Sequence, residues 1–249
     1  MSPIFRGDEI YLNYRNLDFG TFFYGNELLV YTKFTGNIMK EIKQSHFFGF
    51  YNALVEGDNE KCTLLVQSLI DEGADLKDIY IELFQKSLYR IGKLWDHNKM
   101  SIPEEHMATQ IVESLISRFA PMGKSEPQKK VVVSCIDKEF HEIGAKMVSN
   151  VFEMQGWKTY YLGASVPDKE IVKFVKTIDP EIIALSWSLY LNLGRFLEVV
   201  DHLTKFFPTK KIVVGGQALA ENSDKVLKKY KNVKYLDSLD ALESYIKKN

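Results

Sequence analysis

The chain has 249 residues, of which 45% are hydrophobic and 26% charged, and its net charge is −1. This length suggests one large domain or two small ones, and the composition supports a packed core rather than long disorder. Lysines are spread among acidic residues, so no basic surface indicates nucleic acid. No apolar run approaches the roughly 18 residues that cross a membrane, and no secretory signal is visible. We therefore expect a cytoplasmic protein without membrane contact, with Cys62 and Cys135 as buried, reduced thiols.

Residues 1–35 differ from the rest because many aromatic residues alternate with glycine and asparagine. No 3.6-residue period is sustained there, so short strands and an irregular lead-in both remain open. We treat residues 1–35 as an N-terminal segment of unknown role.

Apolar residues recur with a helical period through residues 36–123, which predicts a helical cap domain. Asp58 is a suitable N-cap, and Ser101 with Glu104 forms a capping-box pattern. An antiparallel arrangement of these helices is typical of a small bundle. We expect four helices: about 37–55, Asp58 to Gly73, Asp75 to Trp95, and Ser101 to Phe119.

The stretch Pro121–Gln128 has the composition of a linker, and the pattern changes after it. Through residues 124–249, short β-branched runs alternate with helical patterns. This alternation predicts a parallel sheet with crossover helices. The expected fold class is therefore α/β, with a four-helix-bundle cap followed by a Rossmann-like (flavodoxin-like) domain. The predicted strands are Lys130–Ile136, Lys158–Leu162, Ile182–Ser186, Lys211–Val214 and a last one near Val233–Leu236.

A histidine, His141, follows the first predicted strand, at the edge where open parallel sheets bind their ligands. Glu139 lies two residues before it and is placed to accept the proton of one ring nitrogen, which makes the other nitrogen a better metal donor. Gly144 lets the following helix approach a strand or a ligand closely. Taken alone, a loop histidine beside a glutamate is more often an ordinary surface feature.

Two further short motifs follow later strands at set intervals. Gly144 is followed by 41 residues (145–185) and then Ser186-Trp187-Ser188, and 26 more residues (189–214) lead to Gly215-Gly216. Together these elements resemble the cobalamin-binding pattern DxHxxG, SxL and GG. Glu139 stands in place of the Asp of that pattern, and Ser188 in place of its Leu.

The resemblance implies a bound cobalamin (vitamin B12) whose cobalt takes His141 as its lower ligand. The displaced nucleotide tail would enter a slot lined by Ser186, with Gly215 and Gly216 leaving room for it. Gly163 either lines the corrin or only makes a turn, and Trp187 either contacts the tail or packs on the sheet. The other residues expected around the cofactor are Glu139, Phe140, Glu142, Ile143, Gly144, Leu162, Ser188 and Leu189.

The helical region carries a second resemblance. Trp95 is followed by nine residues (96–104) and then Glu105-His106, which is similar to the W-x9-EH signature of the CarH-type light-sensing adenosylcobalamin regulators. This implies that Trp95 and Glu105 cover the upper face of adenosylcobalamin and that His106 binds cobalt after light breaks the cobalt–carbon bond. His106 also lies near a predicted helix N-terminus, which favours the neutral imidazole that binds metals. The alternative is a core tryptophan and a solvated first helical turn.

These patterns support two functional hypotheses. The favoured one is a cobalamin photoreceptor, not an enzyme, that changes its contacts with copies of itself or with a protein partner on illumination. The alternative is a corrinoid protein that carries a methyl group, as methylcobalamin, for a methyltransferase system. No basic helix-turn-helix precedes the cap, so we expect no direct DNA binding.

Overall fold

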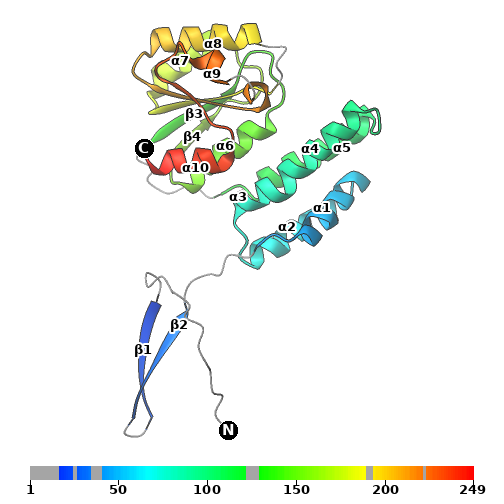
Figure 1. The fold of residues 1–249 in the computed structure, drawn as a ribbon, viewed down its shortest axis with the longest axis vertical. Helices are drawn as coiled ribbons and strands as arrows, with labels where there is room; N and C mark the ends of the chain where they lie inside the picture. Colours follow the sequence, from blue (N-terminus) through cyan, green and yellow to red (C-terminus); the bar gives the residue numbers. More distant parts are fainter. Residues whose placement is uncertain (1–16, 25–26, 35–40, 122–128, 189–192, 221–222) are drawn as a thin grey trace.

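The computed structural model describes residues 17–24, 27–34, 41–121, 129–188, 193–220 and 223–249. They form a two-stranded hairpin, a group of helices and a parallel sheet covered by helices (Figure 1). Apart from Pro121, the predicted linker Pro121–Gln128 lies outside the described residues. The predicted α/β fold class, a helical cap followed by a Rossmann-like domain, is confirmed.

The N-terminal hairpin consists of β1 (Leu17–Tyr24) and β2 (Glu27–Phe34), which pair antiparallel along their whole length. Of the two possibilities that the sequence leaves open for this region, the structure has the short strands. Figure 1 draws the hairpin apart from the helices and the parallel sheet.

The described residues of the cap form four helical segments, as the apolar period predicts. The first two are α1 (Gln44–Glu56) and α2 (Asn59–Asp71). The third is continuous and combines α3 (Leu76–Ile79), the π-helical turn η2 (Tyr80–Gln85) and α4 (Lys86–Asp96), and the fourth is α5 (Ile102–Arg118). None of the described helices is both long and apolar enough to span a bilayer.

Contacts at the helix starts explain these boundaries. Asp58 Oδ1 accepts a hydrogen bond from the Lys61 backbone at 2.9 Å, and α5 begins with the predicted capping box of Ser101 and Glu104. The first helix begins at Gln44 and not near residue 37, because the backbone of Lys43 is extended and donates to His46 Nδ1 at 3.1 Å. That contact closes the first turn and fixes where α1 starts.

The C-terminal part contains a five-stranded sheet in which all neighbouring strands run parallel among the described residues. All five strands match the predicted runs. Their spatial order, β4-β3-β5-β6-β7, is that of flavodoxin-like sheets, whose ligands bind outside the carboxyl ends of the strands where the order reverses. That point lies between β3 and β5. The strands are β3 (Lys130–Cys135), β4 (Lys158–Tyr161), β5 (Ile182–Ser186), β6 (Lys211–Gly215) and β7 (Val233–Tyr235).

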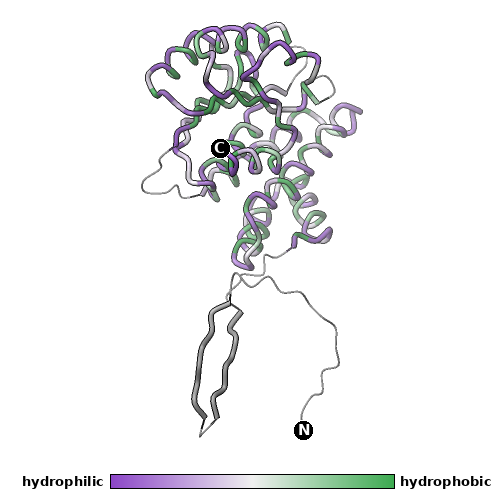
Figure 2. The backbone as a smooth tube through the Cα atoms, turned by 60° about the vertical axis from the view of Figure 1, so that its left-hand side comes forward, coloured by the Kyte–Doolittle hydropathy of each residue, from purple (hydrophilic) through white to green (hydrophobic). Residues whose placement is uncertain are grey.

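Helices cover both faces of this sheet (Figure 1). Figure 2 shows the apolar strands between the two layers. Because strand side chains alternate between faces, Val131 and Val133 join the hydrophobic cluster on the cap side, whereas Val132 joins the cluster on the other side. The cap-side layer holds α6 (Ile143–Met154) and α10 (Leu239–Lys247); the opposite layer holds α7 (Asp168–Ile178), α8 (Leu193–Phe206) and α9 (Ser223–Leu227).

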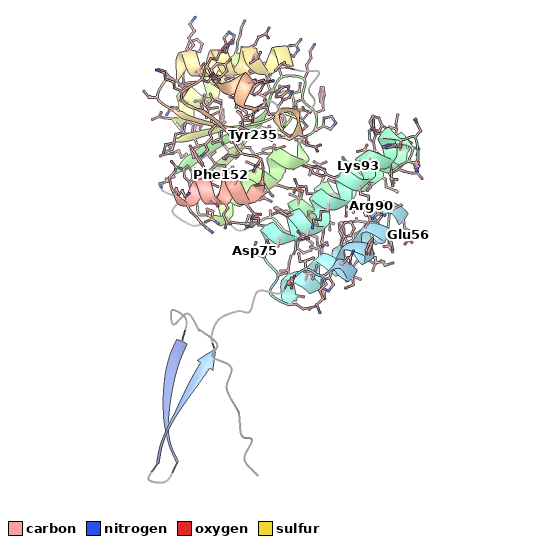
Figure 3. All side chains as sticks on the ribbon, viewed as in Figure 1. Glu56, Asp75, Arg90, Lys93, Phe152 and Tyr235 are labelled. Atoms are coloured by element: carbon pink, nitrogen blue, oxygen red, sulfur yellow. The ribbon has the colours of Figure 1, made fainter. Side chains whose placement is uncertain are left out.

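The cap packs directly on the α6–α10 layer. One hydrophobic cluster includes Phe50 and Phe84 of the cap together with Phe152 of α6; Phe152 is labelled in Figure 3. Polar side chains add contacts across the same boundary: Lys77 with Asp240 (2.6 Å) and Glu243 (2.8 Å), Tyr80 with Asn150 (2.7 Å), and Glu113 with Lys146. These contacts fix the position of the cap relative to the sheet.

Candidate functional site

The strand register aligns three residue positions at the carboxyl edge of the sheet. Cys135 is paired with Ser186 across β3 and β5, and Ser186 is paired with Gly215 across β5 and β6. The loop that carries Glu139 and His141 continues directly from Cys135. The sheet therefore brings the three sequence motifs, which are far apart in the chain, to one edge.

The backbone of the loop after β3 is held in place by the neighbouring loop after β4. Lys138 and Ser165 both have positive φ angles, of 60° and 51°. The Lys138 backbone N–H donates to Ser165 Oγ at 3.1 Å, and the Ser165 N–H donates to the Glu139 carbonyl at 2.9 Å. This reciprocal pair fixes the turn that presents the next three residues.

Glu139 is fully buried and its carboxylate connects two loops. Oε1 lies 2.6 Å from His141 Nδ1 and accepts from the His141 backbone N–H at 2.9 Å. Oε2 accepts from the Ser188 backbone N–H, also at 2.9 Å. A buried carboxylate requires such partners, and the predicted contact between Glu139 and the histidine ring is present.

His141 remains largely exposed although its Nδ1 contacts the buried Glu139. Its side chain keeps 60% of its surface exposed, and the neighbouring Phe140 is 71% exposed. The pKa of His141 is raised, first by the hydrogen bond to Glu139 and further by the charges of Glu139 and Glu105, with burial working against them. A carboxylate at Nδ1 sets the tautomer that leaves Nε2 free to donate to a metal.

Four residues expected near the cofactor have clear roles within the protein itself. Glu142 accepts a hydrogen bond from the Tyr161 hydroxyl at 2.6 Å, and Ile143 packs against the cap-side cluster. Leu162 packs against the opposite cluster. Gly163 has a φ of +85° and accepts from the Cys135 N–H at 3.0 Å, so it makes the turn after β4.

The glycines of the motifs differ in what surrounds them. A Cβ on Gly216 would lie 2.1 Å from the Trp187 carbonyl oxygen, and its φ is +109°, so the fold itself requires glycine there. A Cβ on Gly215 would meet only the Leu236 carbonyl at 3.5 Å, and one on Gly144 only Ser186 Oγ at 4.0 Å. The fold itself therefore does not require glycine at Gly144 or Gly215, the two positions beside Ser186 where the resemblance puts the nucleotide tail.

The first two residues after β5, Trp187 and Ser188, both have contacts within the protein. Trp187 is fully buried and stacks on Phe196 with ring centroids 4.5 Å apart. Of the two roles that the sequence leaves open for Trp187, contact with the nucleotide tail or packing on the sheet, the structure shows packing. Ser188 acts through its backbone N–H on Glu139. Leu189 lies outside the described residues.

The three predicted cap residues, Trp95, Glu105 and His106, differ in their exposure and contacts. Trp95 is 48% exposed at the end of α4, so the alternative of a core tryptophan is wrong. It borders a shallow pocket of about 350 Å³ with Met100 and Ile102. His106 has 71% of its side chain exposed, 3.6 Å from Glu105. The charge of Glu105, in contrast, contributes to the raised pKa of His141.

Two tyrosines at this edge are absent from the sequence prediction. The Tyr235 hydroxyl, at the end of β7, donates to the Gly216 carbonyl at 3.3 Å. Its pKa is raised by burial and, in part, by Asp237 and by Tyr89 of α4, a residue that is 44% exposed. Figure 3 labels Tyr235 together with Arg90 and Lys93, which lie on α4. No motif includes either tyrosine, and an exposed aromatic on an otherwise polar helix face was the available signal for Tyr89.

A helical cap packed on one helical layer of a flavodoxin-like sheet, with a carboxylate-oriented histidine at the point where the strand order reverses, defines a class of cofactor-binding protein. Comparison with known proteins names the family. Residues 47–119 and residues 129–239 each match a family model described as B12 binding domain. The chain therefore belongs to the B12-binding proteins and binds cobalamin.

Several curated relatives are corrinoid proteins. A corrinoid protein of Desulfitobacterium hafniense is 23% identical over 188 residues, which cover 72% of this chain and 83% of the relative. Trimethylamine corrinoid protein 1 of Methanosarcina mazei is 24% identical over 183 residues, covering 70% and 85%. The solved structure of the Methanosarcina barkeri monomethylamine corrinoid protein superimposes with a TM-score of 0.72 at 14% identity, over 84% of this chain and all of that chain, which shows a shared fold.

These relatives overturn the favoured hypothesis from the sequence. The prediction of a photoreceptor rests on Trp95, Glu105 and His106, whereas relatives that match 70% or more of this chain are corrinoid proteins, one of them named for trimethylamine. The photoreceptor prediction is therefore wrong. A tryptophan and a Glu-His pair at that spacing fit the end of one amphipathic helix and the first turn of the next, and such a pattern does not specify light sensing.

Proposed function

We propose that this protein is a corrinoid carrier that accepts a methyl group from one protein partner and delivers it to another. The observation that carries the proposal is the buried Glu139 carboxylate, 2.6 Å from Nδ1 of an otherwise exposed histidine at the switch point of the sheet. The names of the relatives, which include trimethylamine and dimethylamine corrinoid proteins, support the methyl-carrying role. They also favour methylcobalamin over adenosylcobalamin as the loaded form.

The residues at the carboxyl edge fit a cobalamin. His141 would be the lower ligand through Nε2, because Nδ1 is engaged by Glu139. Gly144 and Gly215, which lie beside Ser186 and which the fold itself does not require to be glycine, would leave room for the nucleotide tail. Phe140 offers an exposed aromatic face next to the ligand histidine. Bound cobalamin would supply a cobalt centre that takes up and releases a methyl group.

The cap would exclude water from the opposite side of the cofactor. Glu105 already faces the His141 loop closely enough to raise the pKa of that histidine. Trp95 and His106, both exposed at the same end of the cap, are proposed to lie along the upper face. In this proposal the chain itself catalyses nothing, since the partners activate the methyl donor and the acceptor.

Methylation of the reduced holoprotein tests the carrying role. The purified chain is loaded with hydroxocobalamin, reduced anaerobically and mixed with methyl iodide, a small methyl donor that needs no partner. We expect the spectrum of a methylated corrinoid that stays bound during gel filtration, and transfer of the methyl group to an added thiol. His202→Ala serves as a control, because His202 lies on α8 and pairs with Asp168 away from the site. A holoprotein whose reduced cofactor resists methyl iodide would contradict the proposal.

A further inference from the structure

A groove lies in the helical layer that faces away from the cap. It has a volume of about 420 Å³ and runs between α8 and the segment that contains α9. Its lining combines three apolar side chains with three lysines: Leu193, Leu197, Val226, Lys225, Lys228 and Lys229. The layer that contains α7, α8 and α9 is opposite the α6–α10 layer on which the cap packs (Figure 1). An occupant of this groove would therefore not displace the cap.

The floor of the groove is apolar and supported from below. Leu193, Leu197 and Val226 pack against the hydrophobic cluster on this side of the sheet, but all three remain only partly buried. Leu193 and Leu197 are one helical turn apart on α8, so they form a single stripe. The unburied part of these side chains offers contact for an apolar group of a ligand.

The rim of the groove is basic although the whole chain has a net charge of −1. Lys229 is paired with Asp201 of α8 at 3.1 Å, and the Tyr230 hydroxyl donates to the same carboxylate at 2.6 Å. These bonds tie α8 to the chain after α9 and fix the width of the groove. Lys225 and Lys228 are exposed, and no acidic side chain among the described residues forms a salt bridge with either.

We propose that this groove binds an acidic segment of a partner protein, in which one apolar side chain is flanked by carboxylates. The apolar side chain would rest on Leu193, Leu197 and Val226, and the carboxylates would pair with Lys225 and Lys228. A free phosphate would leave the apolar floor uncovered. A lipid surface is a poorer fit than a peptide, because the apolar side chains line a groove between charged residues and do not protrude.

A labelled peptide tests the proposal without the natural partner. The probe is a fluorescein-labelled pentapeptide with one central leucine and two glutamates on each side of it, titrated with the full chain by fluorescence anisotropy. Two control peptides replace the leucine by serine or all glutamates by glutamine. We expect both control peptides to bind about tenfold more weakly than the probe.

Charge-reversal variants locate the binding. Lys225→Glu combined with Lys228→Glu should weaken probe binding by about tenfold or more. The matched control is Lys169→Glu combined with Lys173→Glu, two exposed lysines of α7 in the same layer, which should bind as the wild type does. Leu197→Ser should weaken the probe but not the serine peptide. All four lysines are exposed, so circular dichroism should show unchanged folding.

Three results would overturn the proposal. The first is equal affinity of the wild type and the Lys225/Lys228 variant for the probe, and the second is no binding of the probe to the wild type. The third is lysine-dependent binding to phosphatidylglycerol vesicles, or to inorganic phosphate, that is tighter than binding to the probe. None of these readouts depends on the cofactor, so failure here leaves the proposed methyl carriage untouched.

Discussion

The two sides of the candidate cofactor site are built differently. On the Rossmann side, the Glu139 carboxylate is fully buried and makes three contacts that fix the His141 ring and the loop after β5. On the cap side, Trp95 and His106 are exposed, and His106 lies 3.6 Å from the adjacent Glu105. The proposed lower ligand is thus held by the protein itself, whereas Trp95 and His106 keep much of their surface exposed.

This difference predicts unequal effects on cofactor affinity for the residue proposed to bind cobalt and for the residues proposed to cover the cofactor. A preorganised ligand loses little conformational freedom on binding, so its removal should cost most of the affinity. A half-exposed residue that only covers the cofactor should have a smaller effect. The predictions below start where that contrast should be largest.

Substituting His141 by alanine should have the largest effect. The cobalt would lose its only proposed protein ligand, so the spectrum of histidine-ligated cobalamin should disappear and the affinity should fall by about 100-fold. His106→Ala should leave both the spectrum and the affinity near their wild-type values. Titration of each variant with methylcobalamin, followed by absorbance, checks the pair. A wild-type spectrum in His141→Ala would contradict the proposal that His141, and not a cap residue, binds the cobalt.

The neighbouring glycines should respond in opposite ways. Gly216→Ala places a Cβ 2.1 Å from the Trp187 carbonyl oxygen at a φ of +109°, so it should destabilise the apoprotein by about 3 kcal/mol. Urea unfolding of the apoprotein measures this loss. An apoprotein of wild-type stability would mean that the loop relaxes at little cost.

Gly215→Leu should leave the stability of the apoprotein nearly unchanged but weaken the binding of cobalamin. The Cβ at this position would meet only the Leu236 carbonyl at 3.5 Å, but the rest of a leucine side chain would fill the space proposed for the nucleotide tail. Complete cobalamin should therefore lose more affinity than cobinamide, which lacks the tail. Equal losses for the two ligands would argue against a tail slot beside Ser186.

Replacing Glu139 by glutamine should shift the protonation of His141. The hydrogen bond and charge of Glu139 raise the pKa of His141 above its ordinary value of about 6.5. The stability from this pair is therefore fully present below that ordinary value and is lost as the pH rises through the folded-state pKa. Histidine NMR titration of the apoprotein should give a midpoint above the ordinary value, and Glu139→Gln should lower it. The affinity for cobalamin should also fall, by about tenfold.

Loosening the cap should have the smallest effect. Lys77 is largely buried between Asp240 and Glu243 of α10, so Lys77→Met should cost about 1 kcal/mol of stability and increase amide exchange in α3. The control is Lys173→Met, because its exposed pair with Glu170 is 3.8 Å long and should contribute nothing measurable. Equal amide exchange in α3 of both variants would mean that the apolar contacts alone fix the cap.

The sequence predicts the sheet and the ligand loop well because both depend on local pattern. The β-branched runs give all five strands, and the two-residue spacing of Glu139 and His141 leads directly to the observed contact. The different roles of Gly215 and Gly216 could not be predicted, since they depend on how closely the Trp187 backbone approaches. Tyr89 and Tyr235 were missed because only the folded chain brings them to the same edge.

Function was harder to predict than the site. The spacing of Trp95 and His106 carries no information about what covers them, because both side chains are largely exposed. A short motif on a half-exposed helical surface is therefore weaker evidence than one whose residues hold each other in place, as Glu139 and His141 do.

Electron paramagnetic resonance of the divalent cobalt form tests the central claim most directly. The protein is labelled with nitrogen-15 at histidine only, loaded with unlabelled cobalamin and reduced by one electron. If His141 Nε2 is the lower ligand, the cobalt signal should show the doublet splitting of nitrogen-15, and His141→Ala should remove it. A triplet splitting from the unlabelled benzimidazole nitrogen of the cofactor, unchanged by histidine labelling, would contradict the account.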